Sequence, residues 1–292
     1  MAGLLIYLFN PKYTRENKID YETKAGDDPS GEDSALHVVM PRKGDPVLSK
    51  VAYTHSEPLA ASYWLPCHNV PSDRARFSAE FTMAEEETLI ANGNLVENRV
   101  DQGIRTMRYS TEYTLPTYLM AFAIGDFTMQ SRMYGKVPLS IVWRRGLQLN
   151  ATGLLDMLEH QMKTYESLLV PYPFEKYFLV LVPEFPASGV EHAGITFQEE
   201  SKSSDAEIND DFWLSAHELA HQWFGDLVTC RDWSHGWLNE GFATYFETLF
   251  LGHDKGQDEF DYEMRELAEG YFREDGERYR RPVVSRGLRC RC

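Results

Sequence analysis

Two histidines and a glutamate in the second half of the chain have the spacing of a hydrolytic zinc site. His217 and His221 belong to an H-E-x-x-H motif, and Glu240 follows after eighteen intervening residues. Positions four apart lie on one face of a helix, so the two imidazoles can reach a single metal ion. Zinc in a hydrolytic site takes three protein ligands and keeps one position open, and two histidines with one glutamate form a recognised set. We therefore predict one Zn²⁺ held by these three side chains.

Glu218 has a different predicted role, because it lies one residue round the helix from the first ligand. From there its carboxylate can touch a water on the metal without displacing it. The zinc would polarise a peptide carbonyl and lower the pKa of the bound water. Glu218 would take the water proton as general base and deliver it to the leaving amine as general acid. We therefore predict Glu218 as the catalytic residue.

The local sequence predicts that the motif lies on a helix. Residues 209–211 offer N-cap oxygens, and residues 212–228 contain no proline, with Gly225 only near their end. Four apolar side chains fall near helical spacing and are expected in the core: Leu214, Leu219, Trp223 and Leu227. A helix anchored in this way holds metal geometry better than a loop would.

A second helix is predicted over residues 238–251, with Glu240 in its first turn. Glu247 lies seven residues further on and shares the face of Glu240. It could orient a ligand histidine through the ring nitrogen that faces away from the metal. The alternative is that Glu247 is an exposed acid of the helix surface.

The bulk composition predicts a folded chain of about two domains. The 292 residues are 43% hydrophobic and 13% aromatic, which is ample for sizeable cores. The net charge of −16 argues against nucleic acid as a partner, because no basic stripe is present to neutralise phosphates. An acidic surface could favour cationic peptides, or it could serve only to keep the protein soluble.

Neither the ends of the sequence nor its cysteines indicate a membrane or a disulfide scaffold. No stretch approaches the roughly 20 apolar residues of a membrane span. Residues 1–9 are apolar but lack the features of a signal peptide, so we predict a strand over residues 4–9 and, by default, a cytoplasmic location. An export signal could precede this sequence. Cys67, Cys230, Cys290 and Cys292 fit neither a disulfide framework nor a zinc ribbon.

The pattern along the chain predicts two regions of different character. Residues 1–133 contain short runs separated by turn signals, which indicates a β-sheet or sandwich domain. Residues 134–292 carry strand-like and helical patterns together, which indicates a mixed α and β domain. The predicted strands are residues 35–40, 76–83, 106–113, 118–124, 137–143 and 178–182, the predicted helix is residues 152–169, and residues 24–33 are a predicted surface loop.

The metal motif extends over stretches that resemble one family of zinc peptidases. It continues as H-E-L-A-H-Q-W-F-G-D over residues 217–226, and the third ligand lies in W-L-N-E-G-F-A over residues 237–243. Together these stretches resemble the M1 family of zinc aminopeptidases, which are gluzincins. The resemblance implies an α+β chain, with a partial β-sandwich domain followed by a thermolysin-like mixed α/β zinc-peptidase domain. It also implies removal of the N-terminal residue from peptides with a free amine.

A second family signature lies upstream, and this chain departs from part of it. The signature is G-x-M-E-N on the strand edge beside the zinc, and residues 188–192 read S-G-V-E-H. The glutamate is kept as Glu191, whereas the first glycine, the methionine and the asparagine are replaced by serine, valine and histidine. The resemblance implies that Glu191, together with Gly189 and Val190, contacts the substrate.

A third stretch resembles the segment with which the β-domain of the family reaches the active site. It reads E-P-L-A-A over residues 57–61, followed by W-L-P-C over residues 64–67. On this match Glu57 is the second anchor for the α-amine of the substrate. Glu57 and Glu191 could hold an ammonium group by charge-assisted hydrogen bonds. The alternative for either residue alone is an ordinary acid in a surface loop.

The resemblance also implies a tyrosine that stabilises the oxyanion, in a Y-x-K-G-like context several turns past the third ligand. Tyr245 follows Glu240 too closely, and Tyr271 and Tyr279 lack that context. We therefore expect a chain truncated or frame-shifted at its C-terminal end and lacking the earliest strands of the β-domain. Losing one oxyanion donor typically costs about 10²–10³ in turnover, so we expect weak or absent activity.

Two alternative functions stay open on these residues. One is a zinc endopeptidase, since H-E-x-x-H serves both types of peptidase, although Glu191 favours the exopeptidase. The other is a zinc-binding scaffold or fragment with impaired catalysis. The intact Glu218 argues against the scaffold, and the missing tyrosine argues for it.

Overall fold

The computed structural model of the chain describes residues 3–9, 17–18, 36–45, 47–200, 208–278, 280 and 282–284. For residues 3–9, 17–18 and 208–212 it describes the backbone alone. The predicted loop over residues 24–33, Tyr279, Cys290 and Cys292 lie outside the described residues. Cys67 and Cys230 are free thiols.

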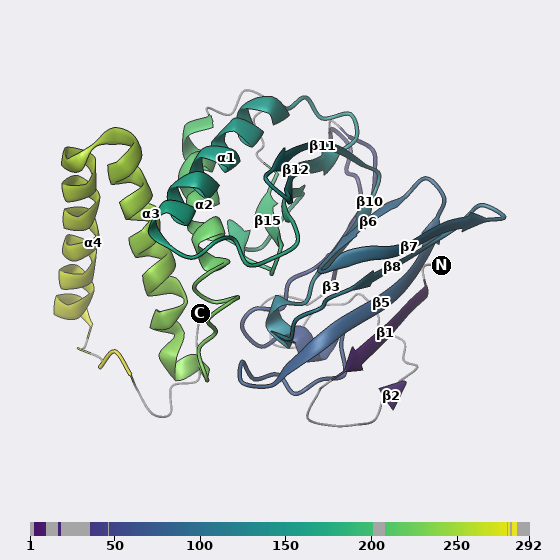
Figure 1. Ribbon diagram of the computed structural model, residues 1–292, viewed down its shortest axis with the longest axis horizontal. Coiled ribbons are helices and arrows are strands. Elements are labelled where there is room, and N and C mark those ends of the chain that lie inside the picture. The colour runs from purple at the N-terminus through teal and green to yellow at the C-terminus, as the bar shows by residue number, and fades with distance from the viewer. Residues whose placement is uncertain are drawn as a thin grey trace.

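The N-terminal half contains two antiparallel sheets (Figure 1). The first has the strand order β2-β1-β5-β8-β7, with β9 paired to β5. Its strands are β1 (Gly3–Phe9), β2 (Asn17–Lys18), β5 (Arg74–Ala84), β7 (Asn94–Asp101), β8 (Ile104–Ser110) and β9 (Leu115–Pro116). Along β5 the buried side chains recur at every second position, as expected for a strand with one face on the core: Phe77, Ala79, Phe81 and Met83. The β7–β8 hairpin turns at Gln102 and Gly103, which both have a positive φ in the left-handed region.

The second sheet has the order β3-β4-β10-β6, with β3 (Leu36–Val39), β4 (Val51–Thr54), β6 (Thr88–Ala91) and β10 (Phe122–Gly125). Here the predicted strand over residues 118–124 is wrong in its first half. Residues Thr117–Leu119 form a 3₁₀ turn, and the strand begins only at Phe122. The reason is a buried side chain, since Asn92 donates to the carbonyl of Leu119 and accepts from the amide of Ala121. These backbone groups are thus satisfied without a neighbouring strand.

The third sheet is mixed and carries the site (Figure 1). Its order is β11-β12-β13-β15-β14, in which β12, β13 and β15 run parallel. The strands are β11 (Phe127–Tyr134), β12 (Val137–Arg144), β13 (Tyr177–Val182), β14 (Gly189–Val190) and β15 (Ile195–Glu199). The predicted strands over residues 137–143 and 178–182 are confirmed. The strand β11 precedes the predicted domain boundary but pairs with β12, and the boundary itself stays a prediction.

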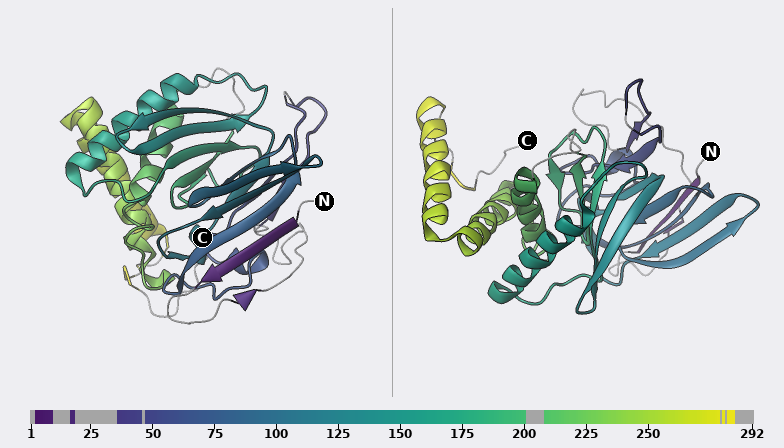
Figure 2. Two further views of the ribbon diagram at one scale, coloured as in Figure 1. Left: turned by 45° about the vertical axis from the view of Figure 1, so that its right-hand side comes forward. Right: turned by 90° about the horizontal axis from the view of Figure 1, so that it is seen from above.

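Four α-helices of the described residues make up the part of the molecule beside this sheet (Figures 1 and 2). They are α1 (Ala151–Leu168), α2 (Ile208–His221), α3 (Glu240–Lys255) and α4 (Gln257–Glu277), and a 3₁₀ segment η3 (Trp233–Leu238) precedes α3. Helix α1 begins one residue before its predicted start, where the Asn150 side chain caps it by accepting from the amide of Gly153 at 3.1 Å. Helix α4 packs on α3 and stands at the outer edge of the molecule (Figure 2).

Helix α2 differs from its prediction at both ends. Residues 209–211, predicted as N-cap positions, lie inside it, and it ends at His221 rather than continuing to residue 228. Directly after His221 the backbone amides of Gln222 and Trp223 bond only three residues back, whereas those of Asp226 and Leu227 bond five residues back. The helix thus ends in a tight turn, and the wider turn that follows leaves Leu227 42% exposed, so its predicted place in the core is wrong. Leu214 is only partly buried. Leu219 and Trp223 are buried as predicted.

One apolar core runs through both halves of the molecule. It joins Trp64 and Phe81 of the N-terminal half to Leu158 of α1, Leu219 of α2 and Phe250 of α3. The α+β fold predicted from the sequence is confirmed. Because the core is continuous, loops from the N-terminal sheets are held in fixed positions against the helices.

A buried arginine links the two halves of the molecule through ion pairs, and this contact is called the joint below. Arg144, at the end of β12, is 3% exposed in its side chain. Its guanidinium meets Glu200 at 2.6 Å and Asp45, which lies between β3 and β4, at 3.1 Å. A bidentate pair of this kind fixes direction as well as distance.

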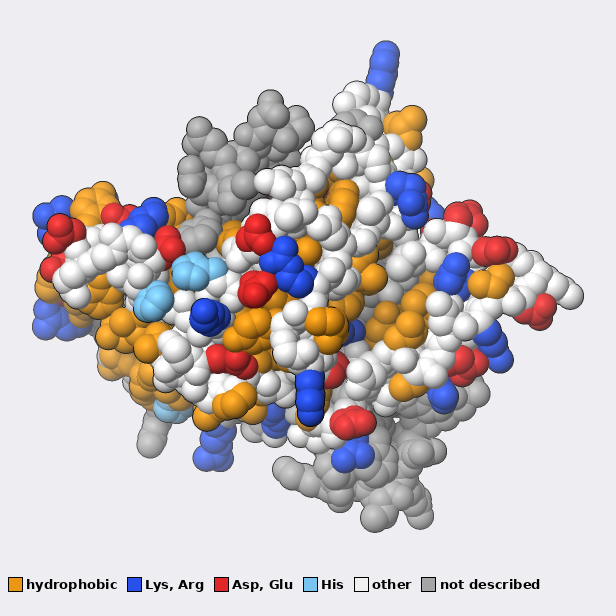
Figure 3. Space-filling model, turned by 45° about the horizontal axis from the view of Figure 1, so that its top comes forward, with side chains coloured by type: hydrophobic (Ala, Val, Ile, Leu, Met, Phe, Trp, Pro, Cys, Tyr) orange, Lys and Arg blue, Asp and Glu red, His pale blue; other side chains and the backbone are white. Residues whose placement is uncertain are grey.

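The surface and the helices give two further observations. On the face shown in Figure 3, acidic and basic side chains are interspersed. Within the described residues, no helix has both the length and the apolar composition that a bilayer crossing requires.

Candidate active site

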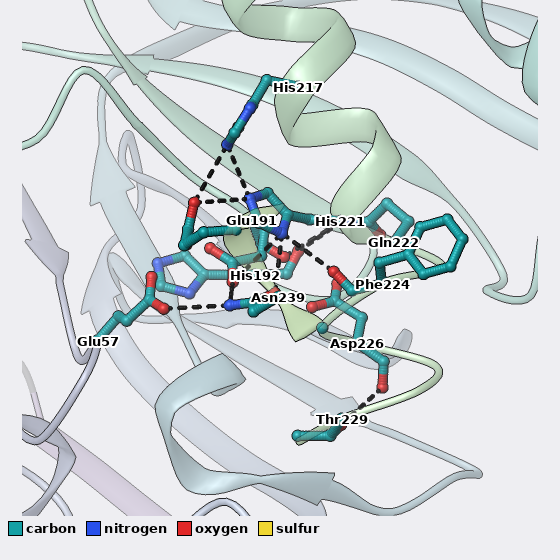
Figure 4. Close-up of polar contacts among 12 residues, drawn as sticks. Glu57, Glu191, His192, His217, His221, Gln222, Phe224, Asp226, Thr229 and Asn239 are labelled. Atoms are coloured by element: carbon teal, nitrogen blue, oxygen red, sulfur yellow. Dashed lines mark hydrogen bonds and ion pairs between the residues drawn. The ribbon is translucent and has the colours of Figure 1, made fainter. Parts of the chain in front are cut away.

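His217 and His221 of α2 lie next to each other (Figure 4). Glu240, the first residue of α3, offers a carboxylate oxygen within 4.8 Å of both. The Nε2 atoms of His217 and His221 are 3.0 Å apart. The Oε2 atom of Glu240 lies 3.4 Å from Nε2 of His217 and 3.6 Å from Nε2 of His221. The sequence-predicted ligand atoms thus form a triangle with nearly equal sides.

This triangle fits a tetrahedral zinc ion. With ligand bonds of about 2.1 Å at the tetrahedral angle, neighbouring donor atoms lie about 3.4 Å apart. The three sides observed, from 3.0 to 3.6 Å, surround that value. The side chain of Glu240 is 58% exposed, whereas that of His221 is 2% exposed. The triangle is therefore open on the side of Glu240, where a fourth position could be reached.

Each imidazole is held through its second nitrogen. The Nδ1 atom of His217 lies 3.1 Å from Oε2 of Glu247, which is the orienting contact predicted for that acid. The Nδ1 atom of His221 lies 2.9 Å from Oδ1 of Asn239 and 3.0 Å from the carbonyl of Phe224. These acceptors place the proton on Nδ1 and leave the Nε2 lone pairs for a metal.

The carboxylates around the histidines also hold protons on them when no cation is bound. Burial alone would lower the pKa of His217, but Glu240 and Glu247 raise it to about 10. Burial likewise opposes protonation of His221, while Glu191 and Glu240 raise its pKa to about 9. A metal ion that binds here must displace these protons, so its affinity falls at low pH.

The predicted catalytic Glu218 lies beside this triangle and has room to act. Its side chain is buried, and its Oε2 atom has no hydrogen-bond partner among the described residues. Burial raises its pKa to about 8, although the two histidines work in the opposite direction. Gly189 on β14 lies so close that a Cβ there would overlap the Glu218 carboxylate. The glycine thus leaves space for a carboxyl group that can exchange protons near neutral pH.

The predicted substrate residues lie on the strand side of the same site. Glu191 follows β14 and is 2% exposed, and Glu57 follows β4 and is partly buried. Carboxylate oxygens of Glu57, Glu191 and Glu240 lie within 4.8 Å of one another. Partial burial and the charge of Glu191 raise the pKa of Glu57 well above its usual value. Such a group of acids suits a cation with several N–H donors.

Gln222 fixes the loop that carries Glu191, and the sequence did not assign it a role. Its amide nitrogen donates to the carbonyl of Glu191 at 3.1 Å. Its amide oxygen accepts from the amide of Gly194 at 2.9 Å and from the hydroxyl of Tyr172 at 3.0 Å. Its position directly after His221 was the only signal in the sequence. Val190, predicted to contact the substrate, is 3% exposed and belongs to a buried apolar cluster that also contains Phe185 and Phe197. Its strand neighbour Gly189 lies beside Glu218.

His192 stands where the family signature has asparagine, and it is fully buried. Its ring meets Phe197 edge-on at 5.0 Å. Burial and the nearby imidazole of His55 lower the pKa of His192 to about 3, so the ring is neutral. The histidine that replaces the asparagine of the signature therefore packs in the core next to Glu191. It is not among the groups that face the metal triangle.

Asn239 is the residue that the sequence analysis missed most clearly. Its amide nitrogen lies 2.9 Å from Oε1 of Glu191 and 3.3 Å from Oε1 of Glu57. Its amide oxygen faces His221, as described above, and Figure 4 shows it between these groups. The signal was its place directly before Glu240.

Tyr245, by contrast, packs on Phe246 and on Phe260 of α4, and no polar contact joins it to the described site.

The mixed sheet, the paired helices and the triangle of two histidines and one glutamate define a gluzincin-type metallopeptidase. Residues 154–288 match the Peptidase family M1 domain, and residues 19–119 match the Peptidase M1 N-terminal domain. The chain belongs to the M1 peptidase family, as the resemblance predicted.

Individual relatives agree with this assignment. Endoplasmic reticulum aminopeptidase 1 of Mus musculus is 34% identical over 207 residues, covering 68% of this chain and 22% of its own length. Aminopeptidase M1-D of Oryza sativa subsp. japonica is 31% identical over 209 residues, with 68% and 24% covered.

The solved structure of an M1 zinc metallopeptidase from Deinococcus radiodurans has a TM-score of 0.67 and 27% identity, covering 80% of this chain and 52% of that chain. A mutant of that enzyme, bound to a Tyr-Ser-Ala substrate, has a TM-score of 0.62 and 27% identity, with 80% and 53% covered. The chain thus spans about a fifth to a quarter of the length of the curated relatives and about half of the solved ones.

Proposed function

We propose that this chain carries the catalytic centre of a zinc aminopeptidase that removes the N-terminal residue from peptides with a free amine. The observation that carries the proposal is the adjacency of two groups. The metal triangle of His217, His221 and Glu240 lies beside the acid pair Glu57 and Glu191. The first suits amide hydrolysis, and the second suits an ammonium group.

The geometry assigns separate tasks to the residues. A zinc ion on the triangle would supply Lewis acidity toward a carbonyl oxygen and make a bound water more acidic. Glu218, with an unpaired Oε2 atom and a pKa of about 8, would accept a proton from water and hand it to the leaving nitrogen. Gly189 keeps the carboxyl group of Glu218 uncrowded.

The acid pair would select the substrate by its charge. An ammonium group between Glu57 and Glu191 gains charge-assisted hydrogen bonds and neutralises two carboxylates that otherwise repel each other. An internal peptide bond has no such cation on its N-terminal side. The pair would therefore hold the first residue of a peptide with its carbonyl toward the metal triangle.

Catalysis by this chain alone would be slow. Among the described residues, neither Tyr245 nor Tyr271 offers a hydroxyl to the site, since Tyr245 packs toward α4 and Tyr271 lies on α4 itself. A missing oxyanion donor costs about 10²–10³ in turnover.

The cytoplasm stays the predicted location.

The peptide Tyr-Ser-Ala, which a solved relative binds, gives a matched pair of probes with its N-acetylated form. Release of tyrosine by the zinc-loaded chain should require the free amine and should stop with a chelator. Glu191→Gln should reduce the preference for the free amine at least about tenfold, because a hydrogen bond to a charged group is lost. The control is Glu199→Gln, which alters an exposed acid at the end of β15.

The alternatives give different results in the same assay. Equal cleavage of both probes would identify an endopeptidase and overturn the proposal. If neither probe is cleaved and Glu218→Gln behaves as the parent chain does, the zinc-binding scaffold is the correct description. Binding of Tyr-Ser-Ala, measured by calorimetry, then reports on the acid pair without turnover.

A further inference from the structure

One amide side chain touches both halves of the site. The Oδ1 atom of Asn239 lies 2.9 Å from Nδ1 of the metal-facing His221. Its Nδ2 atom lies 2.9 Å from Glu191 and 3.3 Å from Glu57. Asn239 is 1% exposed, so water does not compete for these contacts.

The two ends of the amide cannot be exchanged. An amide oxygen turned toward Glu57 and Glu191 would meet two further acceptors, and the nitrogen would face an imidazole N–H. With the observed orientation, the N–H donors meet carboxylates and the oxygen meets a ring nitrogen that also lies near the Phe224 carbonyl. The charges around Asn239 thus permit one orientation only.

The backbone on both sides of the contact is adapted to this side chain. Gly225 has a φ of +127°, and a Cβ there would overlap the amide oxygen of Asn239. The wide turn after α2 brings Gly225 to this place, where a Cβ would also lie 3.5 Å from Nδ1 of His221. Asn239 itself lies between η3 and α3, with a φ of −88° and a ψ of −80°. A larger residue at position 225 would push the amide away from the histidine.

We propose that Asn239 is a positioning residue that joins the metal triangle to the amine anchors. Its oxygen fixes the ring of His221, and its nitrogen holds Glu57 and Glu191 together at the spacing an ammonium group needs. Without this donor no side chain bridges the two carboxyl groups, so their spacing is no longer fixed. This inference rests on the proposed aminopeptidase function and adds a residue that sets substrate affinity without touching the reacting atoms.

The test uses two separate readouts on the full chain. Zinc affinity is measured by competition with a chromophoric chelator. Amine affinity is measured by calorimetry with Tyr-Ser-Ala on zinc-loaded protein in the Glu218→Gln background, where hydrolysis should be strongly slowed. N-acetyl-Tyr-Ser-Ala is the reference ligand. Asn98→Ala, on the exposed strand β7, is the matched control.

Asn239→Ala should weaken zinc binding about tenfold, as loss of a contact to a ligand histidine usually does. It should also weaken Tyr-Ser-Ala binding about tenfold through the released glutamates. Asn239→Asp keeps an acceptor for His221 and should restore zinc affinity to within about threefold of the parent chain. This rescue distinguishes positioning from a general loss of packing.

A double-mutant cycle isolates the second contact. In a Glu191→Gln background, Asn239→Ala should no longer change Tyr-Ser-Ala affinity much, whereas its effect on zinc should remain. Additive effects on the peptide would show that Asn239 does not act through Glu191 and would overturn the inference. If Glu191→Gln itself leaves peptide binding unchanged, the proposed aminopeptidase function fails instead. A thermal unfolding curve confirms that each variant is folded, and Asn239→Ser replaces the alanine variant if it is not.

Discussion

The metal side and the amine side of the site are built in different ways. His217, His221 and Glu240 lie on two helices that follow each other in sequence. Glu57 and Glu191 come from loops after β4 and β14, and Glu57 is 182 residues away from the Asn239 amide that it meets. The first group is fixed by helix geometry, and the second by packing between distant parts of the chain.

This difference predicts how each side responds to damage. The metal side needs only α2, η3 and α3 in place, so local changes there should affect the metal or the chemistry. The amine side depends on the joint between the N-terminal sheets and the mixed sheet. Changes far from the site, at that joint, should therefore affect the amine side first.

The largest expected effect tests the metal side. Glu218→Gln removes the proton acceptor and keeps the shape of the side chain, so turnover should fall by about 10²–10⁴. Zinc content should be unchanged, because Glu218 is not part of the metal triangle. Turnover of Tyr-Ser-Ala and zinc content of the purified protein are the measurements, with Glu159→Gln on the surface of α1 as control. Undiminished turnover in the variant would show that another group moves the proton.

The next effect tests the joint between the halves. Arg144→Met leaves Asp45 and Glu200 as partly buried carboxylates without their shared cation. Removal of one partner from a buried ion pair costs about 3–5 kcal/mol in the free energy of unfolding. The adjacent Arg145 offers a matched control, since its side chain is 63% exposed and pairs with Asp126. Arg145→Met should cost at most about 1 kcal/mol.

Urea unfolding of the two arginine variants measures this contrast. In the folded Arg144→Met protein, affinity for Tyr-Ser-Ala should fall more than affinity for zinc, because Glu57 belongs to the N-terminal side of the joint. Equal losses in both arginine variants would mean that the buried joint has no special role in placing the amine side.

The same difference explains how much of the site could be predicted from sequence. Helical pitch converts the spacing of His217 and His221 directly into proximity. The motif therefore predicted the triangle, and it also pointed to Glu247 behind His217. No local period specifies which loop lies opposite the triangle, so Glu57 was reached only through the family resemblance. Asn239 and Gln222 were missed because their partners lie on distant segments.

The fold shows the same division between local and distant causes. The α+β class, helix α1 and strands β5, β12 and β13 follow from patterns within a few residues. The end of α2 does not, because a tight turn at Gln222 and Trp223 ends the helix four residues before Gly225. The wrong first half of the predicted strand over residues 118–124 has a distant cause too, in the buried side chain of Asn92.

A smaller effect refines the account of the metal side. Glu247→Gln removes the charge behind His217 and should weaken zinc binding about tenfold or somewhat more. Asp254→Asn is the control on the same helix, since Asp254 contacts His160 and not the triangle. Competition with a chromophoric chelator measures both variants. If Glu247→Gln and Asp254→Asn bind zinc with equal affinity, Glu247 is an ordinary acid of the helix surface.

The smallest effect concerns the amine side and depends on pH. The pKa of His192 is lowered from 6.5 to about 3 by burial and by His55, so the unfolded chain binds a proton there more readily than the folded one. The stability from keeping this ring neutral is fully present above pH 6.5 and is lost as the pH falls toward 3. Between pH 7 and pH 5.5 the parent chain should lose about 1 kcal/mol more unfolding free energy than His192→Asn does.

Urea unfolding of the metal-free proteins at the two pH values measures this difference, and protonation of His217 and His221 cancels because both proteins carry them. His160→Asn is the control, since that imidazole is 42% exposed in its side chain on α1. If the parent chain and His192→Asn lose the same stability, the ring behind Glu191 is open to protons in the folded state. The amine side would then be held less rigidly than its contacts indicate, and its rigidity would differ even more from that of the metal side.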